Sequence, residues 1–349
     1  DRYKEGYGIS ERGVRYAAEN DFALVIALDC GIKAIDKVNL ASQLDVDFII
    51  CDHHTPGEEL PKAIAVLDAK REDCNYPYKE LSGCGVGFKL IQAIAKSRGM
   101  DESNLYAYLD LLVVSIAADI VPITGENRIL AYYGLDRINN TPRAGLKALI
   151  LRSKIEKEIG ISDIVFKIGP RINASGRLEH AKASVELLIS TDLEEAIERA
   201  KVVDEVNATR RNFDENITRE AFEMIAEREE QAEWNSTVLF KEDWHKGVIG
   251  IVASRCIEKY YRPTIILTES NAKATGSARS VVDFDIYEAI AECSDLLDQF
   301  GGHKYAAGLT LSVDNVPAFQ AKFEQVVKSR IEEVHRKPVI EVDDELLLD

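Results

Sequence analysis

The sequence predicts an α/β protein in which a parallel-sheet domain is joined by a long helix to a smaller α/β domain. Three apolar runs of strand length alternate with helical stretches near the start of the chain, as in a parallel sheet covered by helices. Residues 193–231 are charged and contain neither proline nor glycine, which predicts one long helix. A second series of strands and helices follows it. The 349 residues are enough for about two domains.

In the first part of the chain, the elements begin with a helix that Ser10 is expected to cap. A strand over 23–28 follows, and its uninterrupted apolar character predicts burial on both faces. A helix over 33–44 leads to two more buried strands, over 48–51 and 63–67. Strand, helix and strand at this spacing are typical of a doubly wound sheet.

Helices are predicted for most of the chain between this sheet and the long helix. Residues 83–87 form a small-residue elbow that leads into a helix over 88–96. A helix over about 103–118 is apolar almost all round and is expected to be central. Loops are expected around Pro122, Pro142 and Pro170.

The second α/β pattern has alternating short strands and helices. The predicted strands cover residues 237–240, 264–267, 273–280 and about 307–311, and the predicted helices cover 247–259, 286–299 and about 316–334.

Composition and charge limit the class of protein. The net charge of −17 argues against a protein that coats DNA non-specifically, but it agrees with a nuclease whose cleft is locally positive. No apolar run reaches the about 18 residues of a membrane span. The six cysteines form no CxxC pair, so we interpret them as small core residues in a reducing cytoplasm.

Acidic and histidine residues follow predicted strands or a buried helix at three places, which are Asp29, Asp52-His53-His54 and Asp119. Ligands of open α/β sheets bind at the carboxyl ends of the strands. Carboxylates with a neutral imidazole suit Mn²⁺ and, with more water, Mg²⁺. The alternative is that each aspartate ends a strand or caps a helix and that the histidine pair is accidental. It is favoured for Asp29 or Asp119 alone, whereas the triplet directly after a buried strand favours a site.

Several motifs resemble one superfamily. Asp52-His53-His54 resembles the defining motif of the DHH phosphoesterases, and the segments around Asp29 and Asp119 look like two of its further aspartate motifs. The segment 169–177 is similar to the element that marks the RecJ-type single-strand DNA exonucleases within that superfamily. In the second half, three segments look like the DHHA1 domain that follows in this family, namely 244–250, 276–280 and 301–308.

The resemblance covers nearly the whole chain and implies its organisation. A DHH domain is expected over 1–192, a connecting helix over 193–232 and a DHHA1 substrate-binding domain over 233–335. Residues 336–349 are expected to start a further, OB-like domain.

The resemblance also implies roles for the motif residues. Asp29 would bridge two Mn²⁺ or Mg²⁺ ions, and His53 and Asp119 would each bind one. His54 would contact the scissile phosphate or help to orient the site. Asp52 would hold an imidazole tautomer through a hydrogen bond.

One motif of the family has no counterpart here. The family carries an Asp-x-Asp cluster upstream of the position of Asp29, and residues 1–28 contain none. We therefore expect the chain to begin after that motif, with an incomplete two-metal site. Activity of this fragment is in doubt on that expectation.

A second set of residues is predicted to bind substrate phosphates. Arg171 and Arg177 can fork onto phosphate oxygens, and Asn173 and Ser175 add neutral hydrogen-bonding groups. The alternative is a tight loop whose arginines pair with local acids such as Glu179.

In the second domain, Arg279 and Ser280 lie on or beside a predicted strand and are expected to contact another phosphate. Gly302 and His303 are predicted to form a backbone cradle for an anion. A turn with a solvated histidine is the alternative. Trp244 is interpreted as a packing residue rather than a stacking platform.

The resemblance implies a hydrolase, a single-stranded-DNA-specific 5′→3′ exonuclease of DNA repair and recombination. Its expected partners are single-stranded DNA, single-strand-binding protein and other repair proteins, with no membrane. One alternative is a DHH/DHHA1 phosphodiesterase of short oligoribonucleotides or cyclic dinucleotides, against which the 169–177 segment argues. Another is a non-catalytic nucleic-acid-binding or scaffold protein, against which the intact Asp29, His53, His54 and Asp119 argue.

Overall fold

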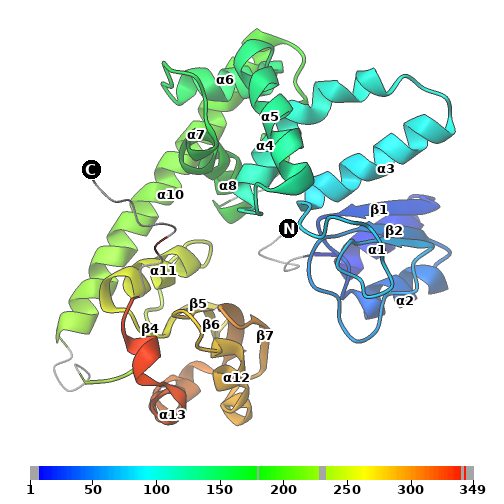
Figure 1. Ribbon diagram of the computed structural model, residues 1–349. Coiled ribbons are helices and arrows are strands. Elements are labelled where there is room, and N and C mark those ends of the chain that lie inside the picture. The colour runs from blue at the N-terminus through cyan, green and yellow to red at the C-terminus, as the bar shows by residue number, and fades with distance from the viewer. Residues whose placement is uncertain (1–7, 179–180, 228–232, 339–341, 343–349) are drawn as a thin grey trace, which may run out of the picture. The chain divides into compact units, whose positions relative to one another are not determined.

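The computed structural model describes residues 8–178, 181–227, 233–338 and 342 (Figure 1). The chain forms two compact units, Asp1–Asn207 and Ala208–Asp349. The division lies inside helix α10 (Leu193–Glu227), which is the predicted long helix. Apart from 336–338 and 342, the segment predicted to start a further domain lies outside the described residues.

The first unit begins with a three-stranded parallel sheet of order β1-β2-β3. Its strands are β1 (Leu24–Leu28), β2 (Asp47–Cys51) and β3 (Ala65–Leu67), which confirms the three predicted strands. The register pairs Leu28 with Cys51 and Cys51 with Leu67. The three strands therefore end side by side, and the residues that follow them meet at one edge of the sheet.

Helices cover both faces of this sheet. On one face, α1 (Glu11–Glu19) and α2 (Ile35–Gln43) pack their apolar residues against Phe48 and Ile50. The Oγ of Ser10 caps α1 as predicted, because it accepts a hydrogen bond from the third residue of the helix.

On the other face lies α3 (Gly83–Ser97), whose Val86 packs with Cys51 and Leu81. The predicted elbow over 83–87 is the first turn of this helix rather than a segment before it. Ser82 caps the helix, and its Oγ accepts a hydrogen bond from the backbone N–H of Gly85.

The predicted burial of β1 on both faces is wrong. Leu24, Ile26 and Leu28 are 43%, 46% and 53% exposed. The three exposed residues alternate along β1, so they lie on the same face of the sheet, the face on which Leu28 meets Gly87 of α3, and α3 leaves this face of β1 partly uncovered. An apolar run predicts a strand, but its burial depends on neighbours that are distant in sequence.

The rest of the first unit is helical, and α4 (Leu109–Ala118) lies at its centre with Leu112, Val113 and Ile116 fully buried. The helix predicted over 103–118 is 3₁₀ in its first part. The elements around α4 are η1 (Glu102–Tyr108), α5 (Gly125–Asn140), α6 (Ala144–Arg152), α7 (Ile161–Asp163), the π-helical η2 (Ile164–Ile168), α8 (Gly169–Leu178) and α9 (Lys182–Ile189).

The loop predicted around Pro170 is wrong, since Pro170 is the second residue of α8. The π-helical η2 runs directly into α8, so Pro170, which has no N–H to donate, lies where the hydrogen-bond pattern changes from that of a π-helix to that of an α-helix. Pro122 and Pro142 do lie between helices, as predicted.

The second unit contains a five-stranded sheet of order β4-β5-β6-β8-β7 in which only β4 and β5 run parallel. Phe319 and Phe323 stack 5.8 Å apart in its core. The strands are β4 (Thr237–Phe240), β5 (Thr264–Ser270), β6 (Lys273–Arg279), β7 (Gln299–His303) and β8 (Ala306–Leu311); the helices are α11 (Ile249–Tyr260), α12 (Ile286–Ala291) and α13 (Val316–Arg330).

The helix predicted over 286–299 is too long, because α12 ends at Ala291 and Gln299 already begins β7. A 3₁₀ turn, η4 (Ser294–Leu296), separates the end of α12 from β7. A Cβ on Gly302 would lie 2.5 Å from the Cα of Ala307, so a residue without a side chain lets β7 pair closely with β8.

The cysteines partly follow their interpretation as core residues. Cys51, Cys256 and Cys293 are buried, whereas Cys84 is exposed. No described helix is both long and apolar enough to cross a membrane.

Replacing Gly145 by alanine is expected to destabilise the first unit. A Cβ at this position of α6 would lie 2.0 Å from the backbone carbonyl oxygen of Leu187 in α9, and backbone cannot rotate away. We expect a loss of about 1–3 kcal/mol, measured as a lower midpoint of urea unfolding by circular dichroism. Gly160→Ala is the control, since nothing lies within 4 Å of its Cβ. Equal midpoints for the two variants would contradict the close approach of α6 and α9.

Candidate metal centre

Three sequence-predicted residues converge on one point of the first unit. The Nε2 atom of His53 lies 3.1 Å from Oδ1 of Asp29 and 3.2 Å from Oδ2 of Asp119. Asp29 follows β1, His53 follows β2, and Asp119 is the C-terminal cap of α4. The carboxyl end of a helix carries partial negative charge, so α4 adds to the attraction that the carboxylates exert on a cation.

The backbone of Asp29 takes an unusual conformation at this point. Its φ is +63°, in the left-handed region, which aspartate tolerates better than most residues. Its N–H still donates to the carbonyl of Cys51, at 2.8 Å. The turn therefore leaves the sheet at Asp29 without breaking the last hydrogen bond to β2.

A hydrogen bond at Nδ1, the other ring nitrogen, fixes the orientation of the His53 ring. Nδ1 lies 3.1 Å from the carbonyl oxygen of Leu81, so it donates a proton there. The lone pair of a neutral ring is then on Nε2, which is buried and has no partner with hydrogen-bond geometry. A lone pair that faces two carboxylates is stable only with a proton or a cation between them, so the group fits a metal ion.

His54 and Asp52 lie next to the three converging residues and are bonded to each other. The Nδ1 atom of His54 lies 2.7 Å from Oδ1 of Asp52, the hydrogen bond expected from the sequence. Asp52 is 1% exposed, and its Oδ2 accepts from the N–H of Ile32 at 2.9 Å. The ligand-capable atoms of Asp29, His53 and His54 all lie within 4.8 Å of one another.

The pKa shifts follow from this crowding of charge. The carboxylate of Asp29, and then the charge of Asp119, raise the pKa of His53 although burial lowers it. Burial is the main cause that raises the pKa of Asp119. Burial also opposes ionisation of Asp52, but hydrogen bonds from His54 and from three backbone N–H groups outweigh it and lower the pKa of Asp52. The two carboxylates thus favour a positive charge at Nε2 of His53, and a divalent cation can supply that charge in place of a proton.

The donor set of carboxylate oxygens and imidazole nitrogen is the one preferred by Mn²⁺ and compatible with Mg²⁺. Among the described residues it comprises Asp29, His53 and Asp119, with His54 beside them.

Comparison with known proteins agrees with this geometry. The DHH family, N-terminal domain, matches residues 4–116, and the DHHA1 domain matches residues 234–329. The single-stranded-DNA-specific exonuclease RecJ of Bacillus subtilis is 41% identical over 346 residues, which are 98% of this chain. A crystal structure of exonuclease RecJ bound to manganese superposes with a TM-score of 0.82 at 32% identity, over 97% of this chain and 83% of that one.

The chain belongs to the RecJ family. It spans 43% of the length of the Bacillus subtilis RecJ. The crystal structure of RecJ from Thermus thermophilus in complex with Mg²⁺ is 29% identical, with a TM-score of 0.72, over 91% of this chain and 47% of that one.

The segment that resembles the RecJ-marking element is helical in this RecJ-family chain. Gly169–Leu178 is helix α8, so the tight loop that was the alternative for this segment is wrong as a description of its backbone. Arg171 is 8% exposed and donates from Nε to Oδ1 of Asp204 at 2.8 Å. Its pairing acid therefore lies 33 residues away, whereas Glu179, the acid expected from the sequence, lies outside the described residues.

The helix also divides the four predicted phosphate residues between its faces. Ser175 is 1% exposed and its Oγ accepts from that of Ser184 at 3.0 Å. Asn173 is exposed and Arg177 is half-buried. Arg171 and Ser175 thus face inward in this structure, and Asn173 is the member that α8 presents to solvent.

In the second unit, Arg279 and His303 lie in one row across the sheet. The register pairs Arg279 of β6 with Ala306 of β8, and Ala306 with His303 of β7. Directly paired residues point to the same face, so these side chains share one face at a separation of about two strand spacings, or about 10 Å. Gly302, the residue before His303, belongs to β7, so the turn that was the alternative for this segment is wrong.

Some of the polar side-chain atoms near this row already make hydrogen bonds within the protein. The Nη1 atom of Arg279 donates to Oγ of Ser277 at 3.0 Å, and Oγ of Ser280 donates to the carbonyl of Phe284 at 2.7 Å. Trp244 is 4% exposed and donates from Nε1 to Glu220, which confirms its interpretation as a packing residue.

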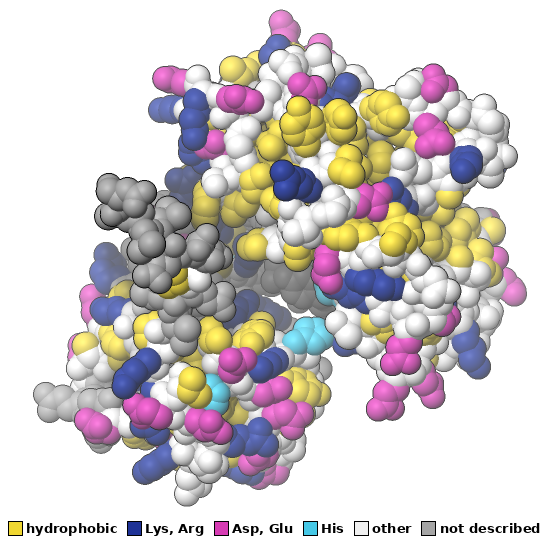
Figure 2. Space-filling model, viewed as in Figure 1, with side chains coloured by type: hydrophobic (Ala, Val, Ile, Leu, Met, Phe, Trp, Pro, Cys, Tyr) yellow, Lys and Arg dark blue, Asp and Glu magenta, His cyan; other side chains and the backbone are white. Residues whose placement is uncertain are grey.

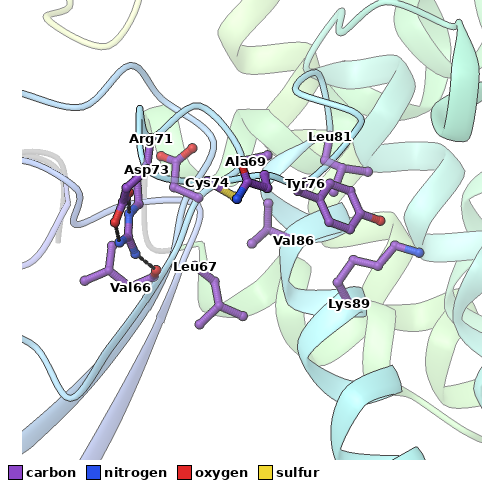
Figure 3. A pocket seen from close by; sticks show the side chains of 12 residues that line it. Val66, Leu67, Ala69, Arg71, Asp73, Cys74, Tyr76, Leu81, Val86 and Lys89 are labelled. Atoms are coloured by element: carbon purple, nitrogen blue, oxygen red, sulfur yellow. Dashed lines mark hydrogen bonds and ion pairs between the residues drawn. The ribbon is translucent and has the colours of Figure 1, made fainter.

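A pocket of about 420 Å³ lies next to the segment that orients His53 (Figure 3). Leu81 and Val86 line it together with Tyr76 and Lys89, and the ion-paired Arg71 lies at its other side. None of the sequence-predicted site residues is among those that line it. Leu81 nevertheless connects the two places, because its side chain lines the pocket while its carbonyl holds His53.

Two residues of the site were missed by sequence reasoning, Leu81 and Gly83. Leu81 acts through its backbone, which no side-chain pattern reveals. A Cβ on Gly83 would lie 2.1 Å from Oδ1 of Asp29, so the missing side chain makes room for the carboxylate. The Gly83 N–H also faces the carboxyl group of Asp119 and opposes the rise of its pKa. The glycine-rich run over 83–87 was the available signal, although it predicted only a change of chain direction.

Gly83→Ala is expected to disable the metal centre while the fold remains. The added methyl group displaces Asp29 from its position 3.1 Å from His53. We expect Mn²⁺ affinity to fall at least about tenfold by isothermal titration, the range found when groups that orient metal ligands are lost. Gly57→Ala serves as the control, since its Cβ meets only ordinary contacts, the nearest at 3.7 Å. Unchanged affinity in Gly83→Ala would show that Asp29 does not bind the ion.

Proposed function

We propose that this chain is the catalytic region of a metal-dependent exonuclease that hydrolyses single-stranded DNA from its 5′ end. The observation that carries the proposal is the approach of Asp29 and Asp119 to Nε2 of His53, at 3.1 and 3.2 Å. Relatives that match nearly all of this chain are RecJ exonucleases specific for single-stranded DNA, and one was solved with manganese bound.

Asp29, His53 and Asp119 would hold Mn²⁺ or Mg²⁺, and Leu81 would keep the ring of His53 in the required orientation. A divalent ion at this position would polarise a phosphodiester and would lower the pKa of a water molecule. His54 is held by Asp52 with its Nε2 available for the substrate phosphate or for orienting the site. The buried hydrogen bonds of Asp52 keep it ionised, so it positions His54 rather than exchanging protons.

Substrate phosphates outside the metal centre would meet the side chains of α8 and the row that contains Arg279 and His303, with Ser280 and Gly302 beside it. Asn173 and Arg177 are the more accessible members on α8, whereas Arg171 and Ser175 support the helix from inside. Contacts of this kind read the sugar–phosphate backbone and not the base sequence. Such recognition suits an enzyme that must digest strands of any sequence.

We propose the same domain limits as the sequence pattern suggests, a DHH domain over 1–192, a connecting helix over 193–232 and a DHHA1 domain over 233–335. The role would be in DNA repair and recombination in the cytoplasm. Single-strand-binding protein is the expected protein partner, because it covers the substrate.

The test uses the natural full-length protein with Mn²⁺ and a 5′-phosphorylated single strand labelled at its 3′ end. We expect progressive shortening from the 5′ end and a loss of at least about 10³-fold in rate in His53→Ala, the scale on which catalytic groups act. His335→Ala is the control, because this histidine lies in a 3₁₀ turn of the second unit.

Two results would contradict the proposal. Full activity in His53→Ala would exclude the metal centre described above. Intact long strands beside rapid hydrolysis of dinucleotides would assign the protein to the short-oligonucleotide phosphodiesterases instead.

A further inference from the structure

An exposed isoleucine in a strained conformation directly follows one of the metal ligands. Ile120 is 79% exposed, and its φ is +55°, in the left-handed region. Of the nine described non-glycine residues with positive φ, it is the one that is branched at Cβ. The left-handed region is sterically costly for such a residue, and here no burial of the side chain offsets the cost.

The end of α4 requires a residue in the left-handed backbone conformation at position 120, but it does not require an isoleucine side chain there. Ile120 follows the C-terminal cap of α4, and its N–H donates to the carbonyl of Ala117 at 3.3 Å. Helices commonly end in a left-handed residue at this position, and glycine or asparagine normally occupies it. An asparagine would therefore keep the backbone and remove the strain.

The loop after Ile120 is held by other groups. The carbonyl oxygen of Pro122 accepts from the hydroxyl of Tyr78 and from Nδ2 of Asn127, both at 3.0 Å. Gly125 then packs closely against the ring of Tyr78. The loop thus keeps its shape without the Ile120 side chain, and this side chain projects into solvent beside Asp119.

We propose that Ile120 contacts the sugar or base of the nucleotide whose phosphate lies at the metal centre, and so positions single-stranded DNA for cleavage. The Cα atoms of neighbouring residues are about 3.8 Å apart. Ile120 therefore lies less than the length of one nucleotide from the metal ion that Asp119 would hold. Apolar contact with a deoxyribose or a base face is independent of sequence, as a general exonuclease requires. This inference rests on the proposed function.

A larger exposed apolar surface lies on α5, but the structure supports a role in substrate contact less well for it than for Ile120. Ile129, Tyr132 and Tyr133 are 59%, 69% and 56% exposed, and hydrophobic side chains gather over the helical part of the first unit (Figure 2). Nothing in the structure indicates what covers that surface. Ile120 differs because it adjoins Asp119, one of the two carboxylates that approach His53.

The test compares Ile120→Asn with wild type in the natural full-length protein with Mn²⁺. We expect kcat/KM for 5′-phosphorylated single strands to fall about tenfold, the usual effect of losing one apolar contact with substrate. Hydrolysis of bis(p-nitrophenyl) phosphate, which has neither sugar nor base, should remain within about twofold, and the Tm should be unchanged or higher because strain is relieved. Ile120→Val keeps an apolar branched side chain and should retain most of the activity on DNA.

Lys154→Asn is the matched control, since Lys154 is also exposed and left-handed, with φ +52°, just after α6. It should leave both activities unchanged. Unchanged cleavage of DNA by Ile120→Asn would overturn the inference and leave the proposed function standing, and a lowered Tm would show that Ile120 packs against protein. If the wild type left single strands intact, the proposed function and the inference would both fall.

Discussion

The metal centre depends on the orientation of one imidazole ring. His53 is bound at Nδ1 by the carbonyl of Leu81 and approached at Nε2 by two carboxylates. The first contact comes from the segment before α3, and the other two come from the ends of β1 and α4. A shift of any one of these elements would move Nε2 of His53 away from the carboxylates of Asp29 and Asp119. The packing of α3 against the sheet therefore decides whether these three side chains can bind one ion.

Electrostatic cost explains why so much structure surrounds this ring. Burying several ionisable groups together is unfavourable unless each has a partner. Asp52 is nearly inaccessible, and its oxygens receive hydrogen bonds from the His54 ring and from backbone N–H groups at residues 32, 53 and 54. The remaining excess of negative charge lies at Asp29 and Asp119, where a cation lowers the energy. The same arrangement that makes the repulsion between these carboxylates unfavourable makes the cluster attract a positive ion.

Glycine has two separate structural tasks in this chain. At Gly83 the missing side chain gives room to a carboxylate, and at Gly302 it gives room to a neighbouring strand. Gly302 also belongs to the segment 301–308, which resembles the family's DHHA1 domain. A glycine in such a motif therefore does not by itself show that a ligand approaches the backbone, because a nearby protein atom explains Gly302 fully.

By itself, the sequence determined seven of the eight described strands, the long helix, the α/β class and the side chains that converge at the candidate metal centre, because these follow from local periodicity and from the chemistry of strand ends. Only the tertiary structure decided the exposure of β1, the helical form of α8, the pairing of Arg171 with Asp204 and the clearance between Gly83 and Asp29. Each of these depends on contacts between residues tens of positions apart. The local sequence does not specify which distant residues will pack at a given position. The candidate ligands were therefore predictable from the sequence, whereas the groups that orient them were not.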